Sequence, residues 1–197
     1  MSRGGHILEA AAGLVAEQGV AGISMRRVAT AARVSLAQVQ YYFHSRAELV
    51  AAVFDHAGDE FVAALGGLLD GEPSPDRFRA IVWEWVPLDT TRERRARIWL
   101  AYAAVAAVDE QLAPDNARLD AQLRDWFTQQ LHALDQAGLV AEQINPTAAS
   151  AQLLALLDGV TVHALTLPMA EREPLAQTVL GDWLDRLVPT DGNRGAD

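Results

Sequence analysis

The sequence predicts an all-α fold, with an N-terminal three-helix domain followed by a larger helical domain. Three observations favour it. Apolar residues recur three or four positions apart through most of the chain, which is the spacing of one helix face. Capping residues and stop residues bracket these segments at short intervals. No segment shows the alternation of apolar and polar residues that a half-buried strand requires, and 50% of the 197 residues are hydrophobic, which is enough for a sizeable core.

The end signals place the individual helices. Ser24 is a candidate N-cap, Ser45 and Glu48 form a capping box, and Asn145 precedes a proline at a first helical position. Helices are expected near Gly4–Gln18, from Ser24, around Val39, from Ser45 to about Leu69, and near Pro75–Val86, Thr90–Val108, Asn116–Ala137, Pro146–Leu167 and Glu171–Val188. We expect residues 1–50 to form the first domain, 51–188 the second, and 189–197 a disordered tail.

The segment Gly22–Phe54 has the pattern of two short helices joined by a tight turn and followed by a newly capped helix. Val28, Ala29 and Ala32 supply the inner face of the first short helix. Val39 and Phe43, four residues apart, supply that of the second. This is the arrangement of a helix-turn-helix, whose second helix enters the major groove of DNA.

The outer face of the second helix is polar and aromatic. With Val39 pointing inward, the residues expected to point outward are Ala37, Gln38, Gln40 and Tyr41, with Tyr42 at the edge. Glutamine side chains can make two hydrogen bonds to an adenine edge, and tyrosine hydroxyls can reach phosphate oxygens. The alternative is an ordinary helical hairpin with a solvated face, which the two glutamines and two tyrosines beside a buried seam disfavour.

The run VSLAQVQYYFHSRAELV resembles the recognition helix and the following capped helix of the TetR family of bacterial transcriptional regulators. The resemblance, with the outward-facing residues above, gives a set of expected DNA contacts. That set is Ser24, Arg26, Arg27, Ser35, Leu36, Ala37, Gln38, Gln40, Tyr41, Tyr42 and Arg46. Arg46 stands where the family usually has lysine, which keeps the positive charge.

Three other positions depart from the family pattern. Arg33 and Ala37 stand where glycine is expected, and Gln40 replaces a tyrosine. A left-handed backbone at Arg33 would store about 1–3 kcal/mol of strain. Either the turn is altered, or Arg33 is kept to touch a phosphate.

Charge is distributed unevenly between the two predicted domains. The net charge is −10, which on its own disfavours DNA. Residues 1–50 nevertheless carry +2, while residues 51–197 carry −12, so a mildly basic head precedes an acidic body. The chain has no cysteine, which excludes disulfides and zinc ribbons. It shows no signal peptide and no apolar run long enough to span a membrane, so a cytoplasmic protein with no membrane partner is expected.

The last two predicted helices are apolar beyond a single stripe and therefore need cover on several sides. The family resemblance implies that they form a four-helix interface between two copies of the chain. The residues expected there are Leu153, Leu157, Val160, Leu175, Val179, Trp183 and Leu187. Two heads about 34–36 Å apart would then reach successive major grooves of DNA. The alternative, that both are core helices of a monomer, stays open.

The middle helices carry aromatic residues in a region that resembles the C-terminal domain of the choline-responsive BetI branch, notably in WVPLDTTRERRARIWLAYAAVA and LLDGVTVHAL. The resemblance implies a small-molecule cavity. Its candidate lining residues are Trp83, Trp99, Tyr102, Trp126, Phe127, Asp158, Thr161 and His163. Aromatic residues at helical spacing are more often core residues, and an acidic residue here can equally pair with arginine or face solvent.

These observations indicate a ligand-responsive, dimeric, DNA-binding transcriptional regulator. We expect a repressor, although the residues themselves do not decide between repressor and activator. The expected partners are double-stranded operator DNA, a small-molecule effector and a second copy of the chain. No catalytic constellation, cofactor motif or metal motif is visible, since the five histidines are scattered and no two lie four residues apart. An enzyme is therefore not expected. The main alternative is a dimeric helical interaction protein that has lost specific DNA reading.

Overall fold

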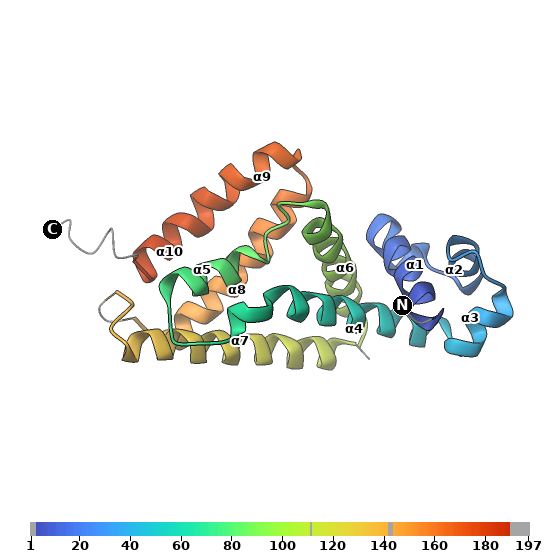
Figure 1. Ribbon diagram of the computed structural model, residues 1–197, viewed down its shortest axis with the longest axis horizontal. Helices are drawn as coiled ribbons and strands as arrows, with labels where there is room; N and C mark the ends of the chain where they lie inside the picture. The colour runs from blue at the N-terminus through green and yellow to red at the C-terminus, as the bar shows by residue number, and fades with distance from the viewer. Residues whose placement is uncertain (1–2, 111, 142–143, 190–197) are drawn as a thin grey trace. The chain divides into compact units, whose positions relative to one another are not determined.

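The computed structural model describes residues 3–110, 112–141 and 144–189, and this part of the chain consists of helices and their connections, with no strand (Figure 1). The all-α prediction is confirmed. The helices are α1 (Arg3–Gln18), α2 (Met25–Ala31), α3 (Leu36–Tyr42), α4 (Arg46–Leu65), α5 (Pro75–Trp83), α6 (Thr90–Ala106), α7 (Ala113–Gln136), α8 (Pro146–Leu165), α9 (Met169–Ala176) and α10 (Asp182–Leu187). Two 3-10 turns, η1 (Val20–Gly22) and η2 (Gly66–Leu69), and a π-helical turn, η3 (Gln177–Gly181), complete the order.

The predicted helix caps are present. The Ser45 hydroxyl accepts a hydrogen bond from the Glu48 amide at 3.0 Å, and the Glu48 carboxylate accepts one from the His44 amide at 2.8 Å. These two bonds form the reciprocal capping box expected at the start of α4. Ser24 and Asn145 cap α2 and α8 through their side-chain oxygens. The first turns of these helices are therefore set by residues beside them in the sequence.

Some boundaries differ from the prediction. The expected long helix ends at Leu65, where Gly66 takes a φ of 40° and the chain tightens into η2. Helix α6 begins at the expected Thr90, and the Asp89 side chain caps it by accepting a hydrogen bond from the Arg92 amide at 2.8 Å. The last expected helix is divided into α9 and α10 by η3, which widens one turn and shifts the faces that follow it.

Packing divides the chain into two compact units. The first, unit 1, contains residues 1–64 and 94–112. Its core takes apolar side chains from α1, α2, α3, α4 and α6, and the most buried are Ile7, Val15, Val28, Val39, Leu49, Val53 and Ile98. The helix-turn-helix therefore rests on α1 and α4, and the inner faces predicted from the sequence lie in this core.

Unit 2 contains residues 65–93 and 113–197. Its core is formed by α5, α7, α8 and the α9–η3–α10 segment, around Phe127, Leu131, Leu153, Leu157, Leu180 and Leu184. Among the described residues, α8 has the length and apolar composition that a membrane span would need. Leu153 and Leu157 of α8 are buried in this core, which is the alternative explanation of that composition.

The chain crosses between the units three times, after Ala64, Glu93 and Leu112. Packing groups α4 and most of α6 with the helix-turn-helix in unit 1, so the boundary of this unit does not coincide with the expected division after residue 50. That division remains a proposal about where the DNA-binding function ends and the ligand-binding function begins. Residues 190–197, most of the predicted tail, lie outside the described residues.

Candidate DNA-binding site and the predicted ligand and dimer residues

The turn between α2 and α3 is built on a left-handed residue. Arg33 has a φ of 53°, and it is the one non-glycine residue with positive φ among the residues described. Its neighbour Val34 donates a backbone hydrogen bond to Ala29 at 2.9 Å, which closes the end of α2. Arg33 therefore takes the left-handed conformation that the sequence left open, and it carries about 1–2 kcal/mol of strain that glycine would avoid.

The outer face of α3 is presented to solvent much as the sequence predicts. Ala37, Gln40 and Tyr41 are exposed, and 77% of the Tyr41 surface is accessible. Gln38 is half-buried, and its backbone N–H donates a hydrogen bond to the Ser35 hydroxyl at 3.1 Å, which caps the helix. Three of the four residues expected to point outward are thus free to meet a base edge, and Gln38 has partial access.

Tyr42 lies at the edge of the outer face, against two neighbours. Its ring meets that of Tyr41 edge-on, with the centroids 5.2 Å apart. On its other side the ring lies against α1, where a Cβ added to Gly4 would come within 3.1 Å of it. The absence of a side chain at Gly4 therefore lets α1 approach Tyr42 and hold its position.

Arg26 and Arg27 are exposed in the first turn of α2. The Arg27 guanidinium bonds to the Gln18 side chain at the end of α1. With Leu14, Thr30 and Ala31, both arginines line an open groove of about 340 Å³. This places two positive charges beside the capped start of α2, where partial positive charge from the helix also gathers.

Arg46 has a role that the sequence did not indicate. Its side chain donates to the carbonyl of Ile23 at 3.0 Å and to that of Val20 at 2.6 Å. These bonds hold the η1 connection, which leads into the N-cap of α2. Through these bonds Arg46 positions the helix-turn-helix. Because Arg46 is also exposed, it remains accessible to a phosphate.

The predicted ligand residues do not form one group in the structure. Trp99 and Tyr102 lie on the part of α6 that belongs to unit 1, where the Tyr102 ring packs 4.6 Å from that of Phe54. In unit 2, Phe127 is fully buried and its ring contacts that of Trp126 at 4.9 Å. The core alternative therefore holds for Phe127, whereas Trp83 and Trp126 are half-buried.

The polar candidates on α8 face different ways. Thr161 is buried, while Asp158 and His163 retain exposed surface. Loss of water around the Asp158 carboxyl, together with the negative charge of Asp120 on α7, raises the pKa of Asp158 to about 6. A cation bound beside Asp158 would reverse that shift. A cavity of 10 Å³ in unit 2 lies among α5 and α7 residues and is lined by none of the predicted ligand residues.

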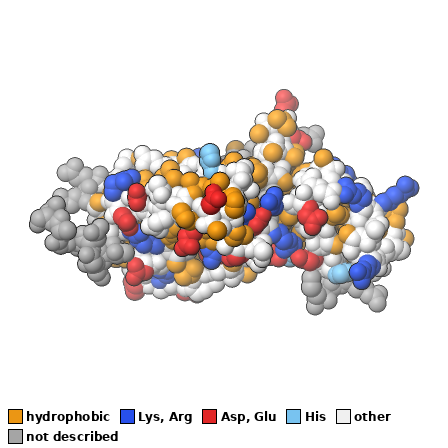
Figure 2. Space-filling model, turned by 90° about the horizontal axis from the view of Figure 1, so that it is seen from above, with side chains coloured by type: hydrophobic (Ala, Val, Ile, Leu, Met, Phe, Trp, Pro, Cys, Tyr) orange, Lys and Arg blue, Asp and Glu red, His pale blue; other side chains and the backbone are white. Residues whose placement is uncertain are grey.

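The dimer prediction needs correction for three residues. Leu153, Leu157 and Val160 are 0–4% exposed in the core of their own unit, so they have no surface to offer a second chain. The face of α8 that carries these three residues packs against α7 and α9, and the opposite face of α8 is left open. The remaining four, Leu175, Val179, Trp183 and Leu187, are half-buried on α9, η3 and α10. Figure 2 looks onto the side of unit 2 that carries α9 and α10, and hydrophobic side chains gather on that side.

The open face of α8 carries small residues. Ala148, Gln152, Ala155, Gly159 and Val162 lie three or four positions apart and are all exposed; we call them the α8 outer face. A Cβ added at Gly159 would meet no atom within 4 Å. Packing within the chain therefore does not require a glycine at this position.

One side-chain group escaped the sequence analysis. Glu9 of α1 lies beside His56 and Glu60 of α4. The metal motif considered in the sequence was a pair of histidines four residues apart, and His56 with Glu60 is a histidine–glutamate pair instead. Glu9 is 47 residues away from His56 in the sequence. The His56–Glu60 spacing was the available signal.

Comparison with known proteins gives two family matches in successive parts of the chain. Residues 7–53 match the family profile of bacterial regulatory proteins of the TetR family. Residues 75–189 match the profile of the BetI-type transcriptional repressor C-terminal domain. Between them the two matches cover most of the chain, and the second alone covers more than half.

Individual relatives agree. An uncharacterized HTH-type transcriptional regulator from the dhlA 5′ region of Xanthobacter autotrophicus is 28% identical over 193 residues, covering 92% of this chain and 89% of the relative. A Saccharomonospora viridis transcriptional regulator, solved in complex with choline, is 18% identical with a TM-score of 0.78, covering 94% of this chain and 97% of that one. AibR, solved with isovaleryl coenzyme A and operator DNA, is 21% identical with a TM-score of 0.69, covering 95% and 99%.

The helix-turn-helix geometry, the basic groove beside it and the two family matches agree with one another. The family is one of transcriptional regulators rather than enzymes. The chain belongs to the TetR family of bacterial regulatory proteins and is a helix-turn-helix transcriptional regulator with a BetI-type C-terminal domain.

Proposed function

We propose that the protein is a cytoplasmic, homodimeric repressor that binds operator DNA through α3 and is released by a small molecule bound in unit 2. The observation that supports it best is the presentation of α3, with Ala37, Gln40 and Tyr41 exposed on a helix held by the buried Val39. A recognition helix needs an exposed polar face and a fixed base, and α3 has both.

The DNA contacts divide by chemistry. We assign base contacts to Ala37, Gln38, Gln40 and Tyr41, because they face outward near the middle of α3. We assign contacts with the phosphate backbone to the charged or hydroxyl-bearing residues and the helix starts, namely Ser24, Arg26, Arg27, Ser35, Leu36, Tyr42 and Arg46. Phosphate contacts set the position of the head, and base contacts set sequence preference.

We place the dimer contact on the α8 outer face together with Leu175, Val179, Trp183 and Leu187. A mid-helix glycine costs about 1 kcal/mol relative to alanine. At Gly159 nothing within the chain uses the missing side chain. Close approach of α8 from a second copy would use it, since small residues let two helix backbones come together.

For the effector we propose a small molecule that carries positive charge and lies near Asp158. Asp158 and Asp120 place two carboxyls close enough for one to raise the pKa of the other. A cation between them would stabilise both charged forms. The Saccharomonospora viridis relative, which was solved with choline, has the same fold and lends this class of effector further support.

The route from effector to DNA runs through helices that the two units share. Helix α6 begins in unit 2 at Thr90 and continues in unit 1 from Arg94. Glu93 is held by Arg172 at 3.0 Å in unit 2, and the next residue, Arg94, is held by Glu9 at 2.9 Å in unit 1. An effector that binds one arrangement of unit 2 more tightly would thereby favour one arrangement of the head.

Fluorescence anisotropy tests this function. The purified protein is titrated onto the DNA upstream of its own gene and onto random DNA of equal length, at two salt concentrations. We expect tighter, salt-sensitive binding to the upstream fragment, and its loss when the effector is added. Absence of binding to any DNA at low salt would instead support an interaction protein that has lost DNA reading.

A further inference from the structure

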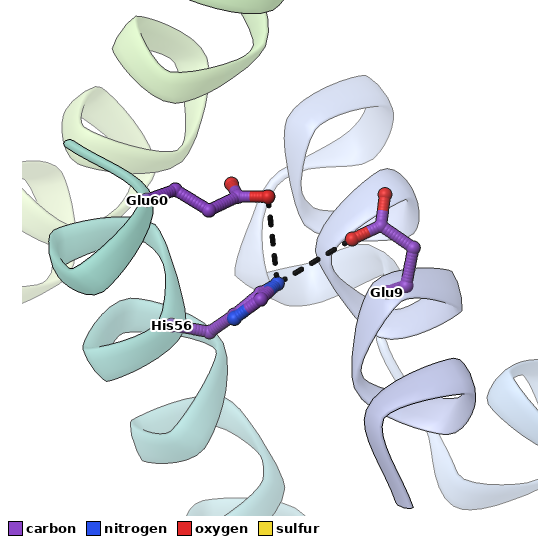
Figure 3. Close-up of side chains that lie close together, drawn as sticks. All are labelled: Glu9, His56 and Glu60. Atoms are coloured by element: carbon purple, nitrogen blue, oxygen red, sulfur yellow. Dashed lines mark hydrogen bonds and ion pairs between the residues drawn. The ribbon is translucent and has the colours of Figure 1, made fainter. Parts of the chain in front are cut away.

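Glu9, His56 and Glu60 bring three metal-ligating side chains to one place in unit 1. Glu9 comes from α1, and His56 and Glu60 come from successive turns of α4 (Figure 3). One ligand atom from each residue lies within 4.8 Å of the other two. All three residues are half-buried, so the group is partly shielded from solvent while remaining accessible to a small ion.

The distances in this group are those of ligands around a metal. His56 Nε2 lies 3.4 Å from Glu9 Oε2 and 3.5 Å from Glu60 Oε1. Both exceed the range of about 2.7–3.2 Å for good N–H···O hydrogen bonds. Two ligands held about 2.0–2.1 Å from a tetrahedral zinc ion lie about 3.4 Å apart. Both contacts are therefore long for a direct hydrogen bond and match the spacing of two ligands of one ion, while the ligand atoms of Glu9 and Glu60 lie within 4.8 Å of each other.

Arg94 fixes the carboxylates from the other side. Its Nη2 contacts Glu9 Oε1 at 2.9 Å, which is the oxygen that does not face His56. Its Nη1 lies 3.5 Å from both oxygens of Glu60. A partner that binds the outer oxygen of a ligating carboxylate orients it and is a regular feature of metal sites. Its positive charge also reduces the affinity for a cation, so the site is of moderate strength.

We propose that Glu9, His56 and Glu60 form a Zn²⁺ site that joins α1 to α4. One imidazole and two carboxylates are a ligand set that zinc accepts, with water completing the tetrahedron. Because the three residues meet only in the folded unit, the ion stabilises that unit. It fixes α1, which packs against Tyr42 at the edge of the DNA-binding face, on the long helix that leads out of the head.

The test is isothermal titration of Zn²⁺ into the full-length protein after chelator treatment. We expect one ion per chain for the wild type, with affinity reduced at least about tenfold by His56→Ala and by Glu9→Gln. His44→Ala is the matched control, since His44 and Glu48 are also a histidine–glutamate pair four residues apart in unit 1. Among the described residues, no third metal-ligating side chain joins that pair. His44→Ala should leave the stoichiometry and affinity unchanged.

Two further measurements make the result decisive. Cobalt substitution should give the intense visible absorption of a four-coordinate ion, and His56→Ala should remove it. Zn²⁺ should raise the unfolding temperature of the wild type and leave that of His56→Ala unchanged, whereas in a plain ion-pair cluster it would change neither. If His56→Ala destabilises the chain, Glu60→Gln replaces it. Equal binding by the wild type and the ligand variants, or no saturable binding by the wild type, would overturn the proposal.

Discussion

Unit 1 and unit 2 differ in how far their function follows from short stretches of sequence. In unit 1 the caps, the turn and the outer face of α3 lie within one segment, from Ser24 to Glu48, and local rules place most of them correctly. In unit 2 the helices themselves were predicted, but which face of α8 is buried depends on how α7 and α9 pack against it, which no pattern within α8 specifies. A local motif can be located from sequence, whereas a surface is defined only by packing.

Among the variants that test the difference between the two units, the largest change in the free energy of unfolding is expected at Arg172 in unit 2. The buried guanidinium bonds to the Pro87 carbonyl at 3.0 Å, the Leu167 carbonyl at 3.2 Å and the Glu93 carboxylate at 3.0 Å. Arg172→Ala removes these three bonds from a buried site and should lower the free energy of unfolding by about 3 kcal/mol. Urea unfolding measures it. The exposed Arg186→Ala, expected within about 0.5 kcal/mol of wild type, is the control.

In unit 1 the sequence preference of α3 is expected to respond next most strongly. Gln38→Ala should reduce discrimination between operator and random DNA by about 1–3 kcal/mol if the amide reads a base. Gln40→Ala changes the more exposed glutamine of the same helix, and its effect is compared with that of Gln38→Ala. Anisotropy on both DNAs measures the difference. Equal losses on operator and random DNA would assign Gln38 to positioning, in keeping with its half-buried place.

Arg33 separates local strain from DNA contact. Arg33→Gly relieves a left-handed backbone but adds chain entropy to the unfolded state, so we expect a net stabilisation of about 0.5–1 kcal/mol. If Arg33 also touches a phosphate, the same variant should flatten the slope of log K against log salt by about one. Thermal unfolding and salt-dependent anisotropy give the two numbers. A stabilised variant with an unchanged slope would leave Arg33 without a DNA role.

The smallest effect is expected at Asp158, and it depends on pH. The folded pKa of about 6 exceeds the ordinary value of 3.8, so the folded state holds this proton more tightly than the unfolded state. The stabilising contribution is full below pH 4 and is lost as pH rises through 6. Asp158→Asn should therefore raise stability at pH 7, by at most about 1 kcal/mol because solvent reaches the carboxyl. No difference from wild type should remain below pH 4.

The all-α class, the order of helices and the exposed outer face of α3 were predicted from sequence, because helix spacing, caps and a tight turn are local signals. The sequence also marked Arg33 as a residue where glycine is expected, and left open whether its backbone is left-handed. The π-helical turn η3, the burial of Leu153 and Leu157, and the three residues that meet at His56 were not predicted. The burial and the His56 group depend on packing between helices, which local patterns do not specify.

We propose that two heads act together because the α8 outer face joins two copies of the chain. Gly159→Leu tests this proposal, since a Cβ added at Gly159 meets no atom of its own chain within 4 Å, while the leucine would keep a second α8 away. Gly58→Leu is the matched control, because Gly58 is also an exposed mid-helix glycine with no atom within 4 Å of an added Cβ. Sedimentation velocity with operator DNA counts the chains bound.

The account predicts two chains per operator for the wild type and for Gly58→Leu. For Gly159→Leu it predicts a folded monomer whose operator affinity falls at least tenfold, about 1.4 kcal/mol. A Gly159→Leu protein that still binds the operator as a dimer, with wild-type affinity, would contradict the account and place the dimer contact elsewhere on the chain.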